Sequence, residues 1–144
     1  MTKYIKQFII TGCLFLVTTT LTLAADSKNS LFINLSSDEI NRAAMAVNLA
    51  NKVLKEKQIP VTIWLNVEGV RLADINIPQS TYVNGKTVRE MLQAFMKDGG
   101  KVIICPMCMK NVGGLDPDMD LLEGVTTEGA LTALFAENVT VLSY

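Results

Sequence analysis

Histidine is absent from all 144 residues of this chain. Its absence excludes Ser-His and Cys-His catalysis, and it excludes zinc sites that use an imidazole ligand. An excess of basic residues is also absent, because 13 Lys and Arg residues stand against 14 Asp and Glu residues. Without a basic cluster, the composition argues against nucleic acid as a partner. Any chemistry must therefore use thiols, carboxylates, lysine or arginine side chains, or backbone amides.

The N-terminus has the pattern of an export signal. Lys3 and Lys6 precede an uncharged apolar run, Phe8–Leu23, and small residues follow at the cleavage position. We expect residues 1–24 to be a cleaved signal peptide, with an uncleaved membrane anchor as the alternative. Cleavage removes two lysines and no acid, so the formal charge goes from −1 to −3. Residues 25–144 then form a periplasmic domain with no stable membrane insertion.

The domain alternates short apolar runs with helical patterns, and neither a repeat nor a second domain is evident. This alternation predicts an α/β fold with three α/β/α layers and a mostly parallel sheet of about five strands. The predicted strands are Leu31–Leu35, Val61–Leu65, Lys101–Cys105, a brief Val125–Thr127, and Val139–Leu142.

Two capping boxes predict where the long helices begin. Ser36 with Glu39 opens a helix that runs to about Lys57, and Thr87 with Glu90 opens a second helix that ends at the following glycine pair. Proline, glycine and polar residues predict a surface loop between Asp74 and Lys86. The shorter predicted helices are a turn at Val70–Ala73, a helix from Pro106 to the glycines at 113 and 114, Pro117–Leu122, and about Glu128–Glu137.

Polar and reactive side chains follow three of the predicted strands at the point where each strand ends. They are Ser36, Ser37 and Asp38, then Asn66, Glu68 and Arg71, and then Cys105 and Cys108. Binding sites in open α/β sheets form outside the carboxyl ends of the strands, so we predict one shared site at this edge. Ser36, Asn66, Glu68 and Arg71 are the candidates for binding substrate. A plain ion pair between Glu68 and Arg71 is the alternative for these two.

Cys105 and Cys108 form a CxxC motif at the junction of a strand and a helix. They are the cysteines that remain after Cys13, which lies within the predicted signal. Pro106 favours an extended Cys105 and suits the first helical position, which places Cys108 in the first turn. Backbone N–H groups at a helix start lower a thiol pKa, so we expect an ionised, accessible nucleophile. Four interpretations remain open: a reactive thiol pair, a structural disulfide, a soft-metal site, and buried inert cysteines.

Methionines surround the motif and make a copper site conceivable. Met107, Met109 and Met119 would supply the thioethers that Cu(I) accepts beside thiolates, but methionine more often fills gaps in a core. Zinc needs four ligands, and two cysteines do not supply them. We therefore expect neither a metal nor another cofactor.

Three segments together resemble the DsrE/DsrF-like family, in a small exported branch. They are Leu31–Asp38, Asn66–Val70 and Cys105–Gly113, within a resemblance that covers about Ser30 to Tyr144. The resemblance implies a three-layer α/β fold and a homo-oligomer, commonly a trimer or hexamer. In the sulfur carriers of this family the active cysteine ends a strand and precedes a glycine by the spacing of Cys105 and Gly113.

This resemblance implies that Cys105 and Cys108 are the catalytic residues and that Lys110 is a basic residue of the substrate site. The chain would accept or pass sulfur as a Cys105 persulfide, with a protein sulfur donor or acceptor as its partner. Cys108 would resolve the intermediate as a disulfide or share the sulfur with Cys105, and a thiol-redox accessory is the other form of this function. The alternatives are a binding module without catalysis, with Cu(I) as one ligand, and a structural oligomer subunit.

Overall fold

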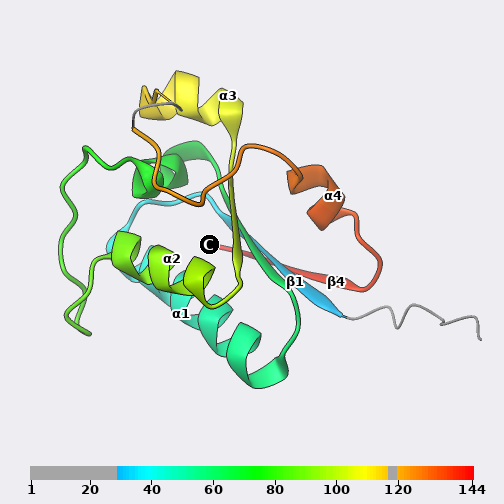
Figure 1. The fold of residues 1–144 in the computed structure, drawn as a ribbon. Helices are drawn as coiled ribbons and strands as arrows, with labels where there is room; N and C mark the ends of the chain where they lie inside the picture. Colours follow the sequence, from blue (N-terminus) through cyan, green and yellow to red (C-terminus); the bar gives the residue numbers. More distant parts are fainter. Residues whose placement is uncertain (1–28, 117–119) are drawn as a thin grey trace, which may run out of the picture.

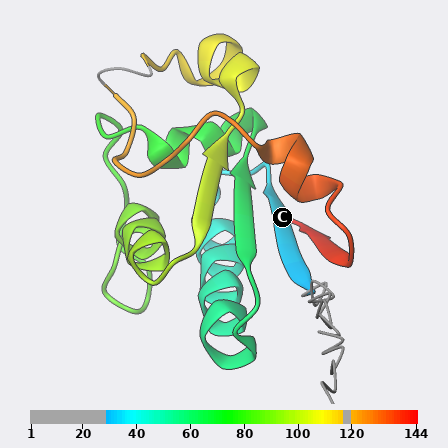
Figure 2. The same ribbon diagram turned by 45° about the vertical axis from the view of Figure 1, so that its right-hand side comes forward.

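Four parallel strands form the centre of the fold in the computed structural model, which describes residues 29–116 and 120–144. The predicted signal peptide lies outside the described residues. The strands are β1 (Ser30–Leu35), β2 (Val61–Leu65), β3 (Lys101–Ile104) and β4 (Val139–Ser143), in the order β3-β2-β1-β4 (Figures 1 and 2). Each coincides with a predicted strand to within one residue. All four carboxyl ends therefore lie along one edge of the sheet.

Two helices, α1 (Ile40–Lys57) and α2 (Val88–Lys97), cover one face of the sheet (Figure 1). Alternate residues of each strand point toward them, as the period of a strand requires. This face forms one buried cluster with the small residues of α1 and the larger apolar residues of α2. Its members include Leu31, Ile33, Leu35, Ile63, Leu65, Ile104, Ala43, Val47, Leu92 and Phe95.

The opposite face carries the other half of each strand and has a thinner cover. Phe32 and Ile103 are buried here, and the Phe32 ring lies 6.1 Å from the ring of Trp64, centroid to centroid. A short helix, α4 (Ala130–Leu134), lies on this side and contacts β4 (Figure 2). The three-layer α/β/α arrangement is thus confirmed.

The predicted fifth strand is a single bridge. Thr126 pairs in parallel with Ile103, donating its N–H to the Val102 carbonyl and accepting from the Ile104 N–H. The sheet of the described residues therefore has four strands rather than five.

The first predicted capping box is wrong, and the second is confirmed. Ser36 and Ser37 remain outside α1, and Glu39 is the N-cap, its carboxylate accepting from the N–H groups of Asn41 and Arg42. These two N–H groups lower the pKa of Glu39. For α2, Thr87 and Glu90 make both reciprocal hydrogen bonds of a capping box.

The carboxyl edge of the sheet is covered by three short helical segments. η1 (Val67–Ala73) is a 3₁₀-helix that extends the predicted turn, and α3 (Pro106–Cys108) continues into η2 (Met109–Gly113), a π-type turn. The last segment ends before Gly114, as predicted. Glu68, Arg71 and Cys108 therefore lie on helical backbone, whereas Ser36, Asn66 and Cys105 lie in the single-residue or short connections before it.

Two predicted helices near the C-terminus need correction. Leu121 makes an isolated bridge with Asp74, so no helix extends to Leu122, and residues 117–119 lie outside the described residues. The helix predicted over Glu128–Glu137 is shorter, because α4 ends at Leu134. Within the described ranges, none of the helices combines the length and hydrophobicity that crossing a membrane requires.

Candidate functional site

Cys105 follows β3 directly and is fixed on both sides by backbone hydrogen bonds. Its N–H donates to the Leu65 carbonyl over 2.9 Å, and its own carbonyl accepts from the Met109 N–H over 3.0 Å. Its backbone is extended, at φ −74° and ψ 112°, as predicted from Pro106. Cys108 lies in the first turn and donates its N–H to the Cys105 Sγ atom over 3.3 Å. Both cysteines are free thiols.

The environment of Cys105 raises its pKa, contrary to the expectation of an ionised thiol. Burial is the main cause, because the residue is only 9% exposed, and the adjacent Cys108 side chain adds to the effect. The N–H groups of Cys108 and Met107 act in the opposite direction and do not overcome it. α3 has only three helical residues, so it supplies few aligned backbone dipoles. Resting Cys105 is therefore a protonated thiol at neutral pH.

Two adjoining cavities lie beside this cysteine. The first, of about 340 Å³, is lined by Cys105, Trp64 and residues of α4, including Leu131. The second, of about 440 Å³, is lined by Met109, Leu115 and Lys110. Pro106 and Thr127 line both cavities and so join them. Lys110 is the one charged residue among those that line the two cavities, and it adds a cation to a largely apolar surface.

Asn66 and Ser36 occupy the positions next to Cys105 across the strand ends. The register pairs Leu35 with Leu65 and Leu65 with Ile104, so the residues that follow are neighbours on one face. Buried Asn66 donates its amide N–H groups to Asn34 Oδ1 and to the Trp64 carbonyl. The Ser36 hydroxyl donates to the Tyr144 carbonyl over 2.9 Å. Neither residue lines the two cavities beside Cys105.

Arg71 and Glu68 do not join the thiol site. The Arg71 Nη1 atom lies 3.3 Å from Asp38 Oδ2, and both residues line a third cavity that shares no lining residue with the other two. Glu68 is exposed, and Arg71 pairs with Asp38 rather than with Glu68. The predicted shared edge is thus divided into a thiol side and an ion-pair side.

The methionines do not converge on the thiols. Met109 is buried in the core, Met107 is exposed, and Met119 lies outside the described residues. Across the described ranges there is also no cluster of three or more Cys, Asp or Glu side chains suited to a metal ion. Among the residues that the structure describes, a soft metal would have the two thiols as its protein ligands.

Sequence reasoning missed Trp64, Thr127 and Leu131 as parts of the site. Trp64 stands two residues before Asn66, so strand alternation places it on the face of Cys105. Nothing in the local sequence indicates that α4 folds back over that face. The contribution of Leu131 depends on tertiary structure alone.

Comparison with known proteins gives one family and one fold. The model of the DsrE/DsrF-like family matches residues 28–143. The crystal structure of the ychN protein from E. coli superposes with a TM-score of 0.56 at 16% identity, covering 80% of this chain and 99% of that chain. At this identity the likeness shows the fold. No curated protein matches the chain.

Proposed function

Because this chain belongs to the DsrE/DsrF-like family, whose members work in sulfur relay with protein partners, we propose that it carries sulfur as a persulfide on Cys105. The observation that carries this proposal is the position of Cys105 at the end of β3, lining a cavity beside Lys110 and within hydrogen-bond reach of the Cys108 N–H. A fixed nucleophile facing an open cavity is what group transfer between two proteins requires.

Sulfur acceptance is a thiol–persulfide exchange. The Cys105 thiol first loses its proton to solvent. The thiolate then attacks the outer sulfur of a donor persulfide, R–S–SH, and the S–S bond of the donor breaks. The donor leaves as the thiolate R–S⁻, and Cys105 keeps the outer sulfur together with its proton. The N–H of Cys108 stabilises the negative charge that the Cys105 sulfur carries once its proton is lost, before the attack.

Cys108 gives the persulfide a second outcome. Its thiolate attacks the inner sulfur of the Cys105 persulfide, forms the Cys105–Cys108 disulfide and releases the outer sulfur as HS⁻. The outer sulfur is reduced and the two cysteines are oxidised, so no further redox partner takes part. Transfer of the outer sulfur to an acceptor thiol competes with this reaction. A reductant of the thiol class must then restore the free thiols.

The cavities suggest that the donor is a protein segment. The walls beside Cys105 are mainly apolar and come from Trp64, Pro106 and Leu131. Such walls favour an extended chain with an apolar side chain next to its persulfide. Lys110 lines the adjoining cavity, where its positive charge favours the donor thiolate R–S⁻ that leaves.

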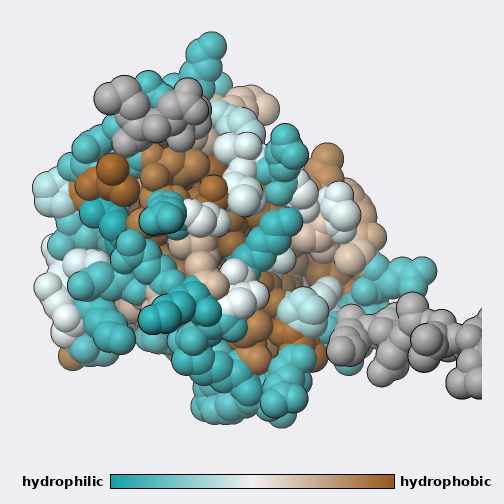
Figure 3. Space-filling model, in the orientation of Figure 1, coloured by the Kyte–Doolittle hydropathy of each residue, from teal (hydrophilic) through white to brown (hydrophobic). Residues whose placement is uncertain are grey.

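Periplasmic location and homo-oligomerisation belong to the same proposal. Location is supported by the N-terminal signal pattern. Association is supported by exposed apolar residues on and after α4, where Leu131 is 68% and Phe135 80% exposed, and Figure 3 shows hydrophobic surface in this region. Among the described residues, β4 also pairs on one side only and contains no charged residue.

Mass spectrometry of the intact protein after incubation with a persulfide-loaded sulfurtransferase tests the proposal. We expect wild type to gain one sulfur atom at Cys105 and Cys105→Ser to gain none. The matched variant, Cys108→Ser, should keep the added sulfur longer, because it cannot form the disulfide. The carrier proposal fails if wild type gains no sulfur, or if Cys105→Ser gains as much as wild type.

A further inference from the structure

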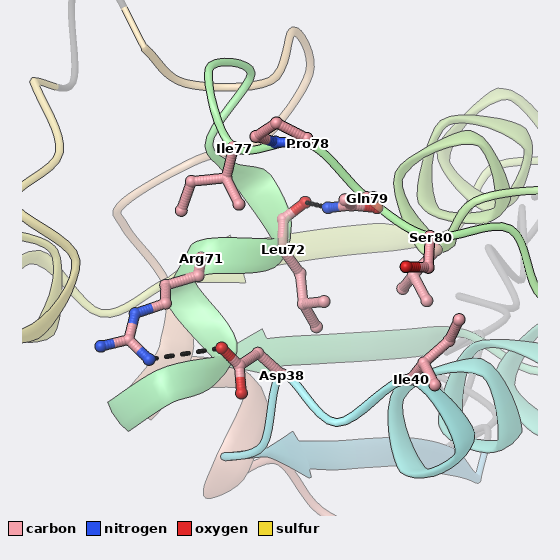
Figure 4. Close-up of a pocket in the computed structure, with 9 residues that line it drawn as sticks. Asp38, Ile40, Arg71, Leu72, Ile77, Pro78, Gln79 and Ser80 are labelled. Carbon is pink, nitrogen blue, oxygen red and sulfur yellow. Dashed lines mark hydrogen bonds and ion pairs between the residues drawn. The ribbon is translucent and has the colours of Figure 1, made fainter.

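The third cavity lies where the start of α1, η1 and the loop after η1 meet (Figure 4). It has a volume of about 230 Å³ and shares no lining residue with the cavities beside Cys105. Its apolar lining comes from Ile40, Leu72, Ile77 and Val88, and the side chains of Gln79 and Ser80 add polar groups. Figure 4 shows Asp38 and Arg71 at one end and Ser80 at the other. The cavity is therefore a short slot with apolar and polar walls and with charges at one end.

The walls of the slot are held by a network of partly buried hydrogen bonds. The Gln79 side chain donates to the Leu72 carbonyl over 3.0 Å and accepts from the Arg89 N–H over 2.8 Å. The Arg89 guanidinium in turn donates to the carbonyls of Asp74 and Ile77. These contacts tie the loop to η1 and α2. The slot is consequently formed before any ligand arrives, which reduces the entropy lost on binding.

Arg71 and Asp38, at the charged end of the slot, form an ion pair, and each can still bind a further group. One contact of 3.3 Å joins Arg71 Nη1 to Asp38 Oδ2, and both side chains are 40% exposed. A guanidinium has five N–H donors and a carboxylate has two oxygens, so each can bind a second group. A lone anion would be repelled by Asp38, and a lone cation by Arg71. The charged end of the slot therefore fits a ligand that carries a positive and a negative group close to each other.

We propose that this slot binds a free α-amino acid with a branched aliphatic side chain. The ligand carboxylate contacts Arg71, its ammonium contacts Asp38, and its side chain lies against Leu72, Ile77 and Val88. The volume of about 230 Å³ accommodates a side chain of this size. This inference goes beyond the sulfur-carrier proposal, because it uses none of the residues that surround Cys105.

Isothermal titration calorimetry with three probes tests the charge requirement. The probes are L-leucine, 4-methylpentanoate, which lacks the ammonium, and 3-methylbutylamine, which lacks the carboxylate. We expect saturable binding of leucine and binding weaker by about tenfold or more for each analogue, the loss of one charge-assisted contact. Absence of saturable leucine binding overturns the proposal. Equal affinity for leucine and either analogue overturns the two-charge recognition.

Variants locate the binding site. Arg71→Met and Asp38→Asn should each weaken leucine binding by about tenfold. Lys55→Met is the matched control, because it breaks the other ion pair of the described residues, at the far end of α1, and should leave leucine binding unchanged. Amide NMR spectra confirm folding and should show leucine-dependent shifts at Leu72, Ile77 and Ser80. If Arg71→Met binds as wild type does, or if shifts occur elsewhere only, the assignment is wrong. Cys105→Ser should bind leucine normally, which separates this result from the sulfur-transfer test.

Discussion

Gly69→Ala is expected to disrupt the carboxyl edge of the sheet. Gly69 is buried, and its N–H donates to the carbonyls of Ser36, over 3.2 Å, and Asn66, over 2.9 Å. A methyl group here would fall well inside van der Waals contact with the Leu35 carbonyl oxygen and 3.1 Å from its carbonyl carbon. Both obstacles are backbone atoms of β1, so no side chain can rotate away. η1 must therefore move back from the end of β1.

The size of the effect follows from two contributions. Forcing a methyl group into this packed region costs about 1–3 kcal/mol. Moving η1 also breaks the hydrogen bond from Gly69 to Ser36, worth about 1 kcal/mol. We expect the free energy of unfolding to fall by about 2–4 kcal/mol, which lowers the melting temperature by about 8–16 °C for a domain of this size.

Chemical denaturation followed by circular dichroism measures this loss. Gly85→Ala is the control, because Gly85 has a φ of +79° in the exposed loop and no atom lies within 4 Å of the added methyl group. That variant carries only backbone strain, about 1 kcal/mol. If Gly69→Ala loses no more stability than Gly85→Ala, the close approach of η1 to β1 does not matter and the reasoning is refuted.

Three further predictions concern a cap, a strained residue and a thiol. Thr87→Ala removes the cap of α2 and should lower the free energy of unfolding by about 1 kcal/mol, measured by denaturation; an unchanged midpoint would contradict the cap. Val67 has a φ of +49° and is 41% exposed, so Val67→Gly should stabilise the protein by about 0.5–1 kcal/mol; destabilisation would show that its side chain matters more than its strain. The rate of Cys105 alkylation should keep rising above pH 9.0, because the pKa of this thiol is raised, and should shift to lower pH in Cys108→Ala. A rate already at its plateau at neutral pH would show that burial does not control the thiol.

The strands were predictable because each is a short apolar run rich in β-branched residues, ended by polar residues. The second capping box, at the start of α2, was predictable because Thr87 and Glu90 stand at the beginning of the helical pattern. The first cap failed for a physical reason. Ser36 is drawn into the sheet edge, where its N–H and hydroxyl both donate to the Tyr144 carbonyl, so Glu39 caps α1 instead. That competition involves residues far apart in the sequence.

The site was predicted in composition but not in arrangement. Strand alternation and register place Cys105, Asn66 and Ser36 together, and both follow from the sequence once strand order is known. The raised pKa of Cys105 was not predictable, because it depends on the cover over the thiol. The separation of Arg71 from the thiol was not predictable either, since it depends on η1, which directs the Arg71 side chain toward Asp38.

A short stretch of backbone connects the two halves of the divided edge. Trp64 lines one hollow and Arg71 lines the other, and between them lie buried Asn66 and the tightly fitted Gly69. A connector so closely packed has little freedom to shift when either hollow fills. A ligand in one cavity should therefore leave the affinity of the other cavity unchanged. The two cavities can then be altered by mutation independently within a single small domain.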